Sequence, residues 1–276
     1  MAHLRRLVAT LVCAPLLVGG LAVEAPAAAA GDVVKVRLHR AIKQLDVSGE
    51  TRRGYDRDKF RHWVDADGDC RDTRDEVLAQ ESKVGVRGCD VQVGRWRSSY
   101  DRVTVRHSTD LDIDHTVALA EAWDSGAKHW NAGTRERFAN DLGDPRSLVA
   151  VTASSNRSKS DRDPAEWMPR FGKCAYVRQW VAVKIRWQLK VDRREKRALT
   201  RRASHCRNVV LRVRMAPVRA RKAGGGGGGG TGSGGTDPRF EYCTDAIAHG
   251  FGPYVKGHDE EYWWYTDGDS DGTVCE

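Results

Sequence analysis

The chain has 276 residues, of which 40% are hydrophobic and 30% are charged, and its formal net charge is +8. After the first thirty residues, no apolar run approaches the roughly 18 residues that a membrane span needs, so a membrane-spanning protein is excluded. The positive charge alone does not choose between nucleic-acid binding, a cell-envelope contact and a solvated helix surface.

Residues 1–30 have the pattern of a secretory signal peptide. Arg5 and Arg6 give a positive start, residues 7–23 form an apolar stretch, and residues 25–30 are the small residues of a cleavage region. We therefore expect a secreted, extracellular protein whose mature chain starts near Gly31.

Between the signal peptide and residue 110, only one helix has a clear start. Residues 33–45 form a short mixed segment. Thr73, as a possible N-cap, and Glu76, as its capping-box partner, predict a helix over residues 73–80. Residues 84–93 have strand-like pieces that glycines interrupt.

From residue 111 onward, buried strands alternate with helices. The expected elements are a strand over 111–114, a helix over 118–130 that ends or bends near Gly126, a short helix over 135–140, a buried strand over 148–151, a polar helix that begins in 152–160, and an amphipathic helix over 176–189. In the last helix an aromatic stripe of Tyr176, Trp180 and Trp187, with Val183, is expected to lie in the core and not to stack on nucleobases.

A glycine-rich run divides the chain. Residues 223–236 cannot bury apolar area and are expected to form a flexible linker between residues 31–222 and a C-terminal module, residues 237–276. Residues 174–222 contain sixteen Lys or Arg against two Asp or Glu, whereas residues 237–276 contain two against ten. The first composition favours polyanions as partners, and the second favours cations.

Six cysteines follow the signal peptide, and an even number in an exported chain indicates disulfides. Sequence alone permits fifteen pairings. Two cysteines lie beyond the linker and are expected to pair with each other, and in the larger part we favour the nearest sequence pairs. The expected disulfides are therefore Cys70–Cys89, Cys174–Cys206 and Cys243–Cys275.

The most informative motif is Asp114-His115, followed by Asn156 in the predicted polar helix. On a regular strand, neighbouring side chains point to opposite faces, so an Asp-His pair is awkward as ordinary packing. A carboxylate that can hold a divalent cation, beside an imidazole that can take a proton from water, is a minimal set of groups for hydrolysing a phosphodiester.

This motif and its surroundings resemble the HNH nuclease family, specifically exported bacterial HNH endonucleases related to the nuclease domain of the modification-dependent restriction enzyme GmrSD. The segments that carry the resemblance are, in order, residues 55–57, Trp63 with 65–74, 111–123, 138–141, 148–159 and 163–167. It covers about residues 50–206. It implies an α+β fold class with a ββα-metal (His-Me finger) nuclease core and surrounding helices.

The resemblance implies that Asp114 and Asn156 are metal ligands and that His115 is the general base of an enzyme that hydrolyses DNA, or alternatively RNA. Such oxygen ligands suit Mg²⁺ or Mn²⁺ first, and the set also accepts Zn²⁺. Many family members have an Asn where this chain has Ser147, so Ser147 or Asn140 is expected to hold the loop at the catalytic centre.

Two basic residues follow Asn156 closely. Arg157 and Lys159 are candidate phosphate-binding residues, and the alternative for both is a solvated helix surface.

The segment from Tyr242 to Glu276 resembles an excalibur domain, a small extracellular calcium-binding module. Three of its Asp residues stand at the first, third and fifth positions of a loop, as in half of an EF-hand. The calcium ligands that the resemblance implies are Asp267, Asp269, Asp271, Thr273 and Glu276.

A second acidic loop repeats part of this pattern through Asp65, Asp67, Asp69 and Glu76, but Cys70 replaces the turn glycine. We favour an acidic turn held by a disulfide over a calcium site there. A rival interpretation of the whole chain is a non-catalytic, calcium-dependent protein that binds the cell envelope or another polyanion. Metal-dependent strand cleavage would separate the two.

Overall fold

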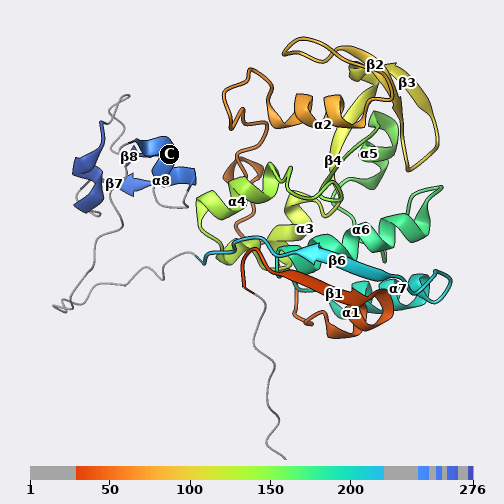
Figure 1. Cartoon of the computed structure of the whole chain (residues 1–276). Helices are drawn as coiled ribbons and strands as arrows, with labels where there is room; N and C mark the ends of the chain where they lie inside the picture. Colours follow the sequence, from red (N-terminus) through yellow and green to blue (C-terminus); the bar gives the residue numbers. More distant parts are fainter. Residues whose placement is uncertain (1–28, 221–241, 249–252, 257–259, 267–272, 276) are drawn as a thin grey trace, which may run out of the picture.

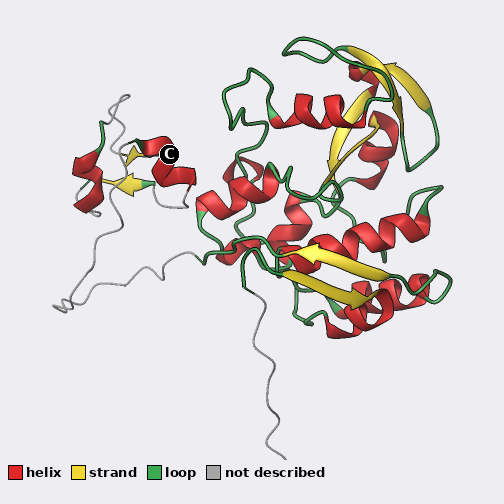
Figure 2. Ribbon diagram, viewed as in Figure 1, coloured by secondary structure: helices red, strands yellow, loops and turns green. Residues whose placement is uncertain are grey.

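The computed structural model describes residues 29–220, 242–248, 253–256, 260–266 and 273–275 (Figure 1). The expected linker, residues 1–28 and the expected calcium ligands Asp267, Asp269, Asp271 and Glu276 lie outside these ranges. Within them the fold mixes helices with two-stranded antiparallel sheets (Figure 2). No helix in these ranges is long and apolar enough to cross a membrane.

The larger part contains its elements in the following order: β1 (Val33–Arg37), α1 (Leu38–Gln44), η1 (Arg57–Lys59), α2 (Thr73–Glu81), β2 (Val93–Arg97), β3 (Thr104–His107), η2 (Ser108–Asp110), β4 (Leu111–His115), α3 (Leu119–Asp124), η3 (Ala127–His129), α4 (Ala132–Ala139), β5 (Leu148–Thr152), α5 (Ala153–Lys159), α6 (Lys173–Arg186), α7 (Arg193–Ala203) and β6 (Val210–Arg214).

The first and last strands of this part pair with each other, β1 antiparallel to β6 (Figure 1). Leu211 and Val213 of β6 are buried, and β6 packs on α6. The alternate side chains of both strands face solvent. One face of the sheet therefore packs on the core, and the other is exposed to solvent.

The main core surrounds α6. Tyr176, Trp180 and Trp187 are each at most 1% exposed, which confirms the prediction that the aromatic stripe is core. Side chains three or four residues apart lie on one face of a helix, so this spacing buries all of them together. The helix starts at Lys173, a few residues before the predicted start.

A second, smaller core lies where α2 and β2 meet the β4–β5 sheet. Leu78, Trp96, Leu111 and Ala150 are buried in it. The indole Nε1 of Trp96 donates to the backbone oxygen of Leu78 at 2.7 Å, so the buried ring leaves no unpaired donor. This core supports β4 and β5 from one side.

The structure corrects two expectations for residues 73–107. The N-cap of α2 is Asp72, whose carboxylate accepts from the backbone N–H of Asp75, and Thr73 instead donates its hydroxyl to Val64. The strands β2 and β3 lie mostly after residues 84–93, because the glycines in that stretch interrupt a regular ladder.

The expected helix over 118–130 is divided at Gly126, whose φ of 137° is a conformation that side-chain-bearing residues rarely adopt. It becomes α3 and η3.

The structure contains the three disulfides Cys70–Cys89, Cys174–Cys206 and Cys243–Cys275. The last one belongs to the C-terminal module, whose described elements are α8 (Cys243–Ala248), β7 (Tyr254–Val255), η4 (Glu260–Trp264) and β8 (Thr273–Val274). Within the described residues its small core is formed by Ala246, Tyr254, Tyr262, Val274 and Cys275. Five such residues bury little area, so the disulfide supplies a needed constraint.

Candidate functional site

Two strands and one helix position the candidate residues. β4 runs antiparallel to β5, with Asp114 opposite Val149 and His115 opposite Leu148. α5 follows β5 directly, and the side chain of Thr152 caps the first turn of α5 by accepting from the Ser155 N–H. A strand, an excursion, a second strand and a helix are thus adjacent in space (Figure 1).

Asp114, His115 and Asn156 line one cavity of about 450 Å³, which we call the His115 cavity. Its lining also includes Arg57 and Arg157. The structure therefore brings together three residues that are up to 42 positions apart in sequence. Their side chains differ in how the surrounding protein holds them.

Asp114 is held at both carboxylate oxygens. Oδ1 accepts from the ammonium of Lys159 at 2.8 Å, and Oδ2 accepts from the hydroxyl of Tyr100 at 2.6 Å. Asp114 is 4% exposed and Lys159 is fully buried. Burial raises the pKa of Asp114, and the charge and hydrogen bond of Lys159 oppose that shift. The Lys159 ammonium and the Tyr100 hydroxyl favour the ionised carboxylate and hold it in a fixed orientation.

His115 packs against two aromatic rings. Trp63 stacks on it at 5.6 Å between centroids, and Phe138 lies on it at 6.3 Å. Its Nε2 is 2.8 Å from the backbone oxygen of Ala139. A carbonyl can only accept, so Nε2 carries the proton and Nδ1 keeps its lone pair.

Burial is also the largest cause that lowers the pKa of His115, to about 3, while the Ala139 carbonyl works in the opposite direction. The ring is therefore neutral at physiological pH. A neutral ring with a defined tautomer can accept a proton through Nδ1.

Asn156 uses only part of its amide in the described contacts. Its Nδ2 donates to Asp112 Oδ2 at 3.1 Å, which fixes the amide orientation and leaves Oδ1 as an acceptor on a residue that lines the cavity. Asp112 stands two residues before Asp114 and therefore on the same side of β4.

The two basic residues after Asn156 have different environments. The side chain of Arg157 is 76% exposed, lines the His115 cavity and lies 3.8 Å from Asp112. Lys159 instead points inward, to Asp114 and to the backbone oxygen of His115 at 3.0 Å. The expected phosphate contact fits the position of Arg157 and does not fit the buried position of Lys159.

Asn140 and Ser147 hold backbone segments and are not among the residues that line the His115 cavity. The Asn140 side chain accepts from the Val64 N–H and donates to the backbone oxygens of Arg61 and Glu136. It thereby fixes the segment next to Trp63. The Ser147 backbone oxygen accepts from Thr116, directly after His115.

Asp141 is a buried residue that the sequence did not single out. It accepts from the Ser147 hydroxyl at 2.6 Å, from the Arg186 guanidinium at 2.7 Å and from the Trp187 indole at 2.8 Å. This network links the start of β5 to the end of α6. A buried Asp after a short helix has no distinctive spacing that would mark it in a sequence.

The donors around the His115 cavity fit a hard divalent cation. Asp114 and Asn156 both offer oxygen, and each carboxylate oxygen has a second lone pair beyond its hydrogen bond. The second acidic loop differs. Oxygens of Asp65, Asp67 and Asp69 lie within 4.8 Å of one another, but Asp65 already accepts from the N–H groups of Gly68 and Cys70. These exposed carboxylates stabilise their own turn beside the Cys70–Cys89 disulfide.

Comparison with known proteins gives two family matches. Residues 72–202 match the C-terminal domain of the GmrSD restriction endonucleases, and residues 240–276 match the Excalibur calcium-binding domain. A relative from Arthroderma benhamiae, described as an uncharacterized secreted protein, is 43% identical over 157 residues, which are 55% of this chain and 76% of the relative. No solved structure matches the chain.

Proposed function

The chain belongs to the family of the GmrSD restriction-endonuclease C-terminal domain and carries an Excalibur calcium-binding domain, and from this premise we propose that it is a secreted, metal-dependent HNH endonuclease. The observation that carries the proposal is the His115 ring, which has one nitrogen fixed by Ala139 and lies in one cavity with Asp114 and Asn156.

His115 would act as the general base. Its Nδ1 takes a proton from the attacking water, and the Ala139 carbonyl stabilises the imidazolium that forms. Contacts with Trp63 and Phe138 restrict the orientation of the ring, which reduces the side-chain entropy that is lost when the substrate binds. A phosphate in the cavity raises the low pKa of His115, because opposite charges favour the protonated ring.

Asp114 and Asn156 would hold the divalent cation, with Mg²⁺ or Mn²⁺ expected first and Zn²⁺ as an alternative. When bound, such a cation withdraws charge from the scissile phosphate and stabilises the leaving 3′ oxygen. Lys159 and Tyr100 hold the Asp114 carboxylate, and Asp112 holds the Asn156 amide. Arg57 and Arg157 are placed at the cavity to contact phosphate oxygens.

The C-terminal module is proposed to bind calcium with Thr273, at the start of β8, and with four oxygens outside the described residues. DNA is the expected substrate and RNA is the alternative. The secreted relative and the signal-peptide pattern support export.

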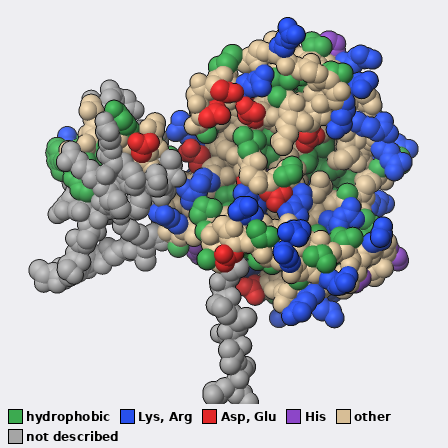
Figure 3. Space-filling view, in the orientation of Figure 1, with side chains coloured by type: hydrophobic (Ala, Val, Ile, Leu, Met, Phe, Trp, Pro, Cys, Tyr) green, Lys and Arg blue, Asp and Glu red, His purple; other side chains and the backbone are tan. Residues whose placement is uncertain are grey.

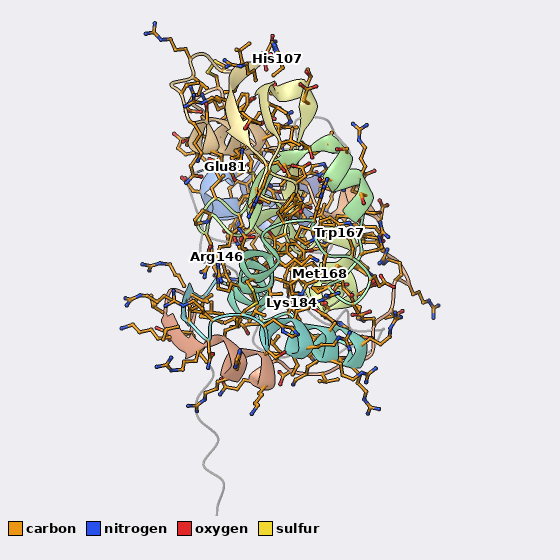
Figure 4. The ribbon with its side chains drawn as sticks, turned by 90° about the vertical axis from the view of Figure 1, so that its right-hand side faces the viewer. Glu81, His107, Arg146, Trp167, Met168 and Lys184 are labelled. Atoms are coloured by element: carbon orange, nitrogen blue, oxygen red, sulfur yellow. A yellow bond between two sulfur atoms is a disulfide. The ribbon has the colours of Figure 1, made fainter. Side chains whose placement is uncertain are left out.

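Cleavage of supercoiled plasmid DNA and of RNA by the purified full-length protein tests the proposal. Activity should require a divalent cation, stop with EDTA and fall at least 10²-fold, a typical general-base contribution, in His115→Gln. Gln keeps an N–H for Ala139 and cannot take the proton. His107→Ala is the matched control, because His107 is an exposed residue of β3 that does not line the His115 cavity (Figure 4).

Full activity of His115→Gln would remove the proposed base. Absence of cleavage with all three metals, in a protein whose far-ultraviolet circular dichroism is that of a folded chain, would reject the nuclease.

A further inference from the structure

The solvent-exposed face of the β1–β6 sheet carries four cations, together with the exposed Val33 and Val210 at its ends. Lys35 and Arg37 of β1 and Arg212 and Arg214 of β6 are all exposed. The register places Lys35 directly opposite Arg212. Like charges directly opposite each other destabilise a strand pair, so the sheet keeps this arrangement at a cost in stability.

A groove beside this face extends the same charge onto α1. It has a volume of about 830 Å³, and its lining includes Lys35, Arg37, Arg40 and Lys43 but no Asp or Glu. We call the six cations Lys35, Arg37, Arg40, Lys43, Arg212 and Arg214 the basic face. Figure 3 shows Lys and Arg side chains on the lower part of the molecule, where β1, β6 and α1 lie in Figure 1, and also along its right-hand margin.

No carboxylate within the described residues forms an ion pair with any member of the basic face. Arg37 donates to the backbone oxygen of Asn208, and Arg214 donates to that of Gly31. The charges are therefore available to an external anion. A groove with several cations and no acid fits a polymer of phosphates better than a single small anion.

We propose that the basic face binds the phosphodiester backbone of a nucleic acid at a place separate from the His115 cavity. The groove and the His115 cavity share no lining residue. The choice of nucleic acid over another polyanion rests on the proposed function. Binding there releases condensed counterions and carries no base sequence information, so it serves affinity for long strands and not the chemical step.

The test compares the full-length protein with Lys35→Glu/Arg40→Glu/Lys43→Glu. The described contacts of these exposed residues do not involve their side chains, so folding is expected to be unchanged. Anisotropy of a labelled DNA duplex in EDTA should show at least about tenfold weaker binding at physiological salt. The slope of log K against log salt should fall by about 2 to 3, because each lost phosphate contact removes about 0.9.

Arg87→Glu/Arg95→Glu/Arg106→Glu is the matched control. It changes the net charge equally at exposed positions in and before the β2–β3 hairpin, and it should bind DNA nearly as the unmodified protein does. Lys35→Gln/Arg40→Gln/Lys43→Gln should fall between the two.

An unchanged affinity in the first variant would overturn the proposal, and so would an equal loss in the control. Loss of binding to vesicles of anionic lipid, with DNA binding retained, would assign the face to the cell envelope instead.

A cleavage measurement separates this proposal from the nuclease itself. The first variant should have a raised KM for plasmid and an unchanged kcat for a small aryl phosphodiester. If the unmodified protein binds DNA through the basic face yet cleaves neither substrate, the nuclease proposal fails and the binding proposal stands.

Discussion

The ammonium of Lys159 lies 2.8 Å from Oδ1 of Asp114, and both side chains are almost fully buried. A divalent cation that bound Asp114 would share this carboxylate with a fixed positive charge. Lys159 therefore stabilises the ionised carboxylate and at the same time offsets part of its attraction for the cation.

Removing one member of this pair should be costly. Lys159→Met leaves Asp114 charged and unpaired in the interior, and we expect the free energy of unfolding to fall by about 3 to 5 kcal/mol in urea with EDTA. Mn²⁺ should restore more stability to this variant than to the unmodified protein, because the cation then replaces the lost charge.

Two further variants show whether the pair is the cause. Arg157→Met removes an exposed charge from the same helix and should change stability by at most about 0.5 kcal/mol. Asp114→Asn/Lys159→Met should recover stability without recovering cleavage. A Lys159→Met protein as stable as the unmodified one would contradict the buried pair.

The depressed pKa of His115 predicts a stability loss in acid. The unfolded ring titrates near its ordinary value of 6.5, whereas the folded ring titrates at about 3. Below pH 6.5 the unfolded chain binds the extra proton, so this contribution is complete above pH 6.5 and is lost as the pH falls toward 3. The loss is at most roughly 5 kcal/mol. Urea unfolding from pH 8 to 4 should show His115→Gln gaining stability relative to the unmodified protein, and parallel curves would refute it.

Glu81 should give the opposite trend. It is the last residue of α2, it accepts from the Ala150 N–H at 3.2 Å, and burial raises its pKa to about 7 (Figure 4). The folded protein then holds a proton that the unfolded chain releases near 4.5, so stability is full below pH 4.5 and falls as the pH rises through 7. Glu81→Gln should equal the unmodified protein at pH 4.5 and exceed it by about 1 to 3 kcal/mol at pH 8. Equal stabilities of Glu81→Gln and the unmodified protein at pH 8 would contradict the raised pKa of Glu81.

The Cys174–Cys206 disulfide joins the start of α6 to the turn after α7 across 32 residues. Loss of this constraint in Cys174→Ser/Cys206→Ser should lower the free energy of unfolding of the larger part by about 2 to 4 kcal/mol. The same change at Cys243 and Cys275, which are also 32 residues apart, is the control and should leave that transition unchanged. The measurement is urea unfolding followed by tryptophan fluorescence, and two equal losses would mean that the parts unfold together.

Periodic patterns predicted the elements that bury one continuous face. The aromatic stripe of α6 and the apolar run of β5 were identified because their side chains repeat with the period of the element. The hairpin β2–β3 was missed. Its strands are short, and exposed charged residues such as Arg95 and Arg97 alternate with the buried residues of β2. The strand pieces were predicted too early in the chain, in the glycine-interrupted stretch that precedes β2.

The sequence predicted which residues form the candidate site but not which residues hold them in place. Asp114, His115 and Asn156 do meet at one cavity. The partners that hold them could not be found by spacing, since Tyr100 and the Ala139 carbonyl come from separate segments that only tertiary packing brings near. Lys159 was predicted to face solvent or a phosphate, because a short basic run at a helix end is usually solvated. In the structure it is buried in an ion pair with Asp114.

The pairing of β1 with β6 determines when the larger part can finish folding. Arg37 donates to the backbone oxygen of Asn208, 171 residues further along the chain. Such a distant closure is slow compared with local helix formation. The ribosome must therefore synthesise the chain as far as residue 214 before β1 can pair with β6. If the chain is exported as proposed, the complete core could form only after most of the larger part has been synthesised. By that time export of the chain would already have begun.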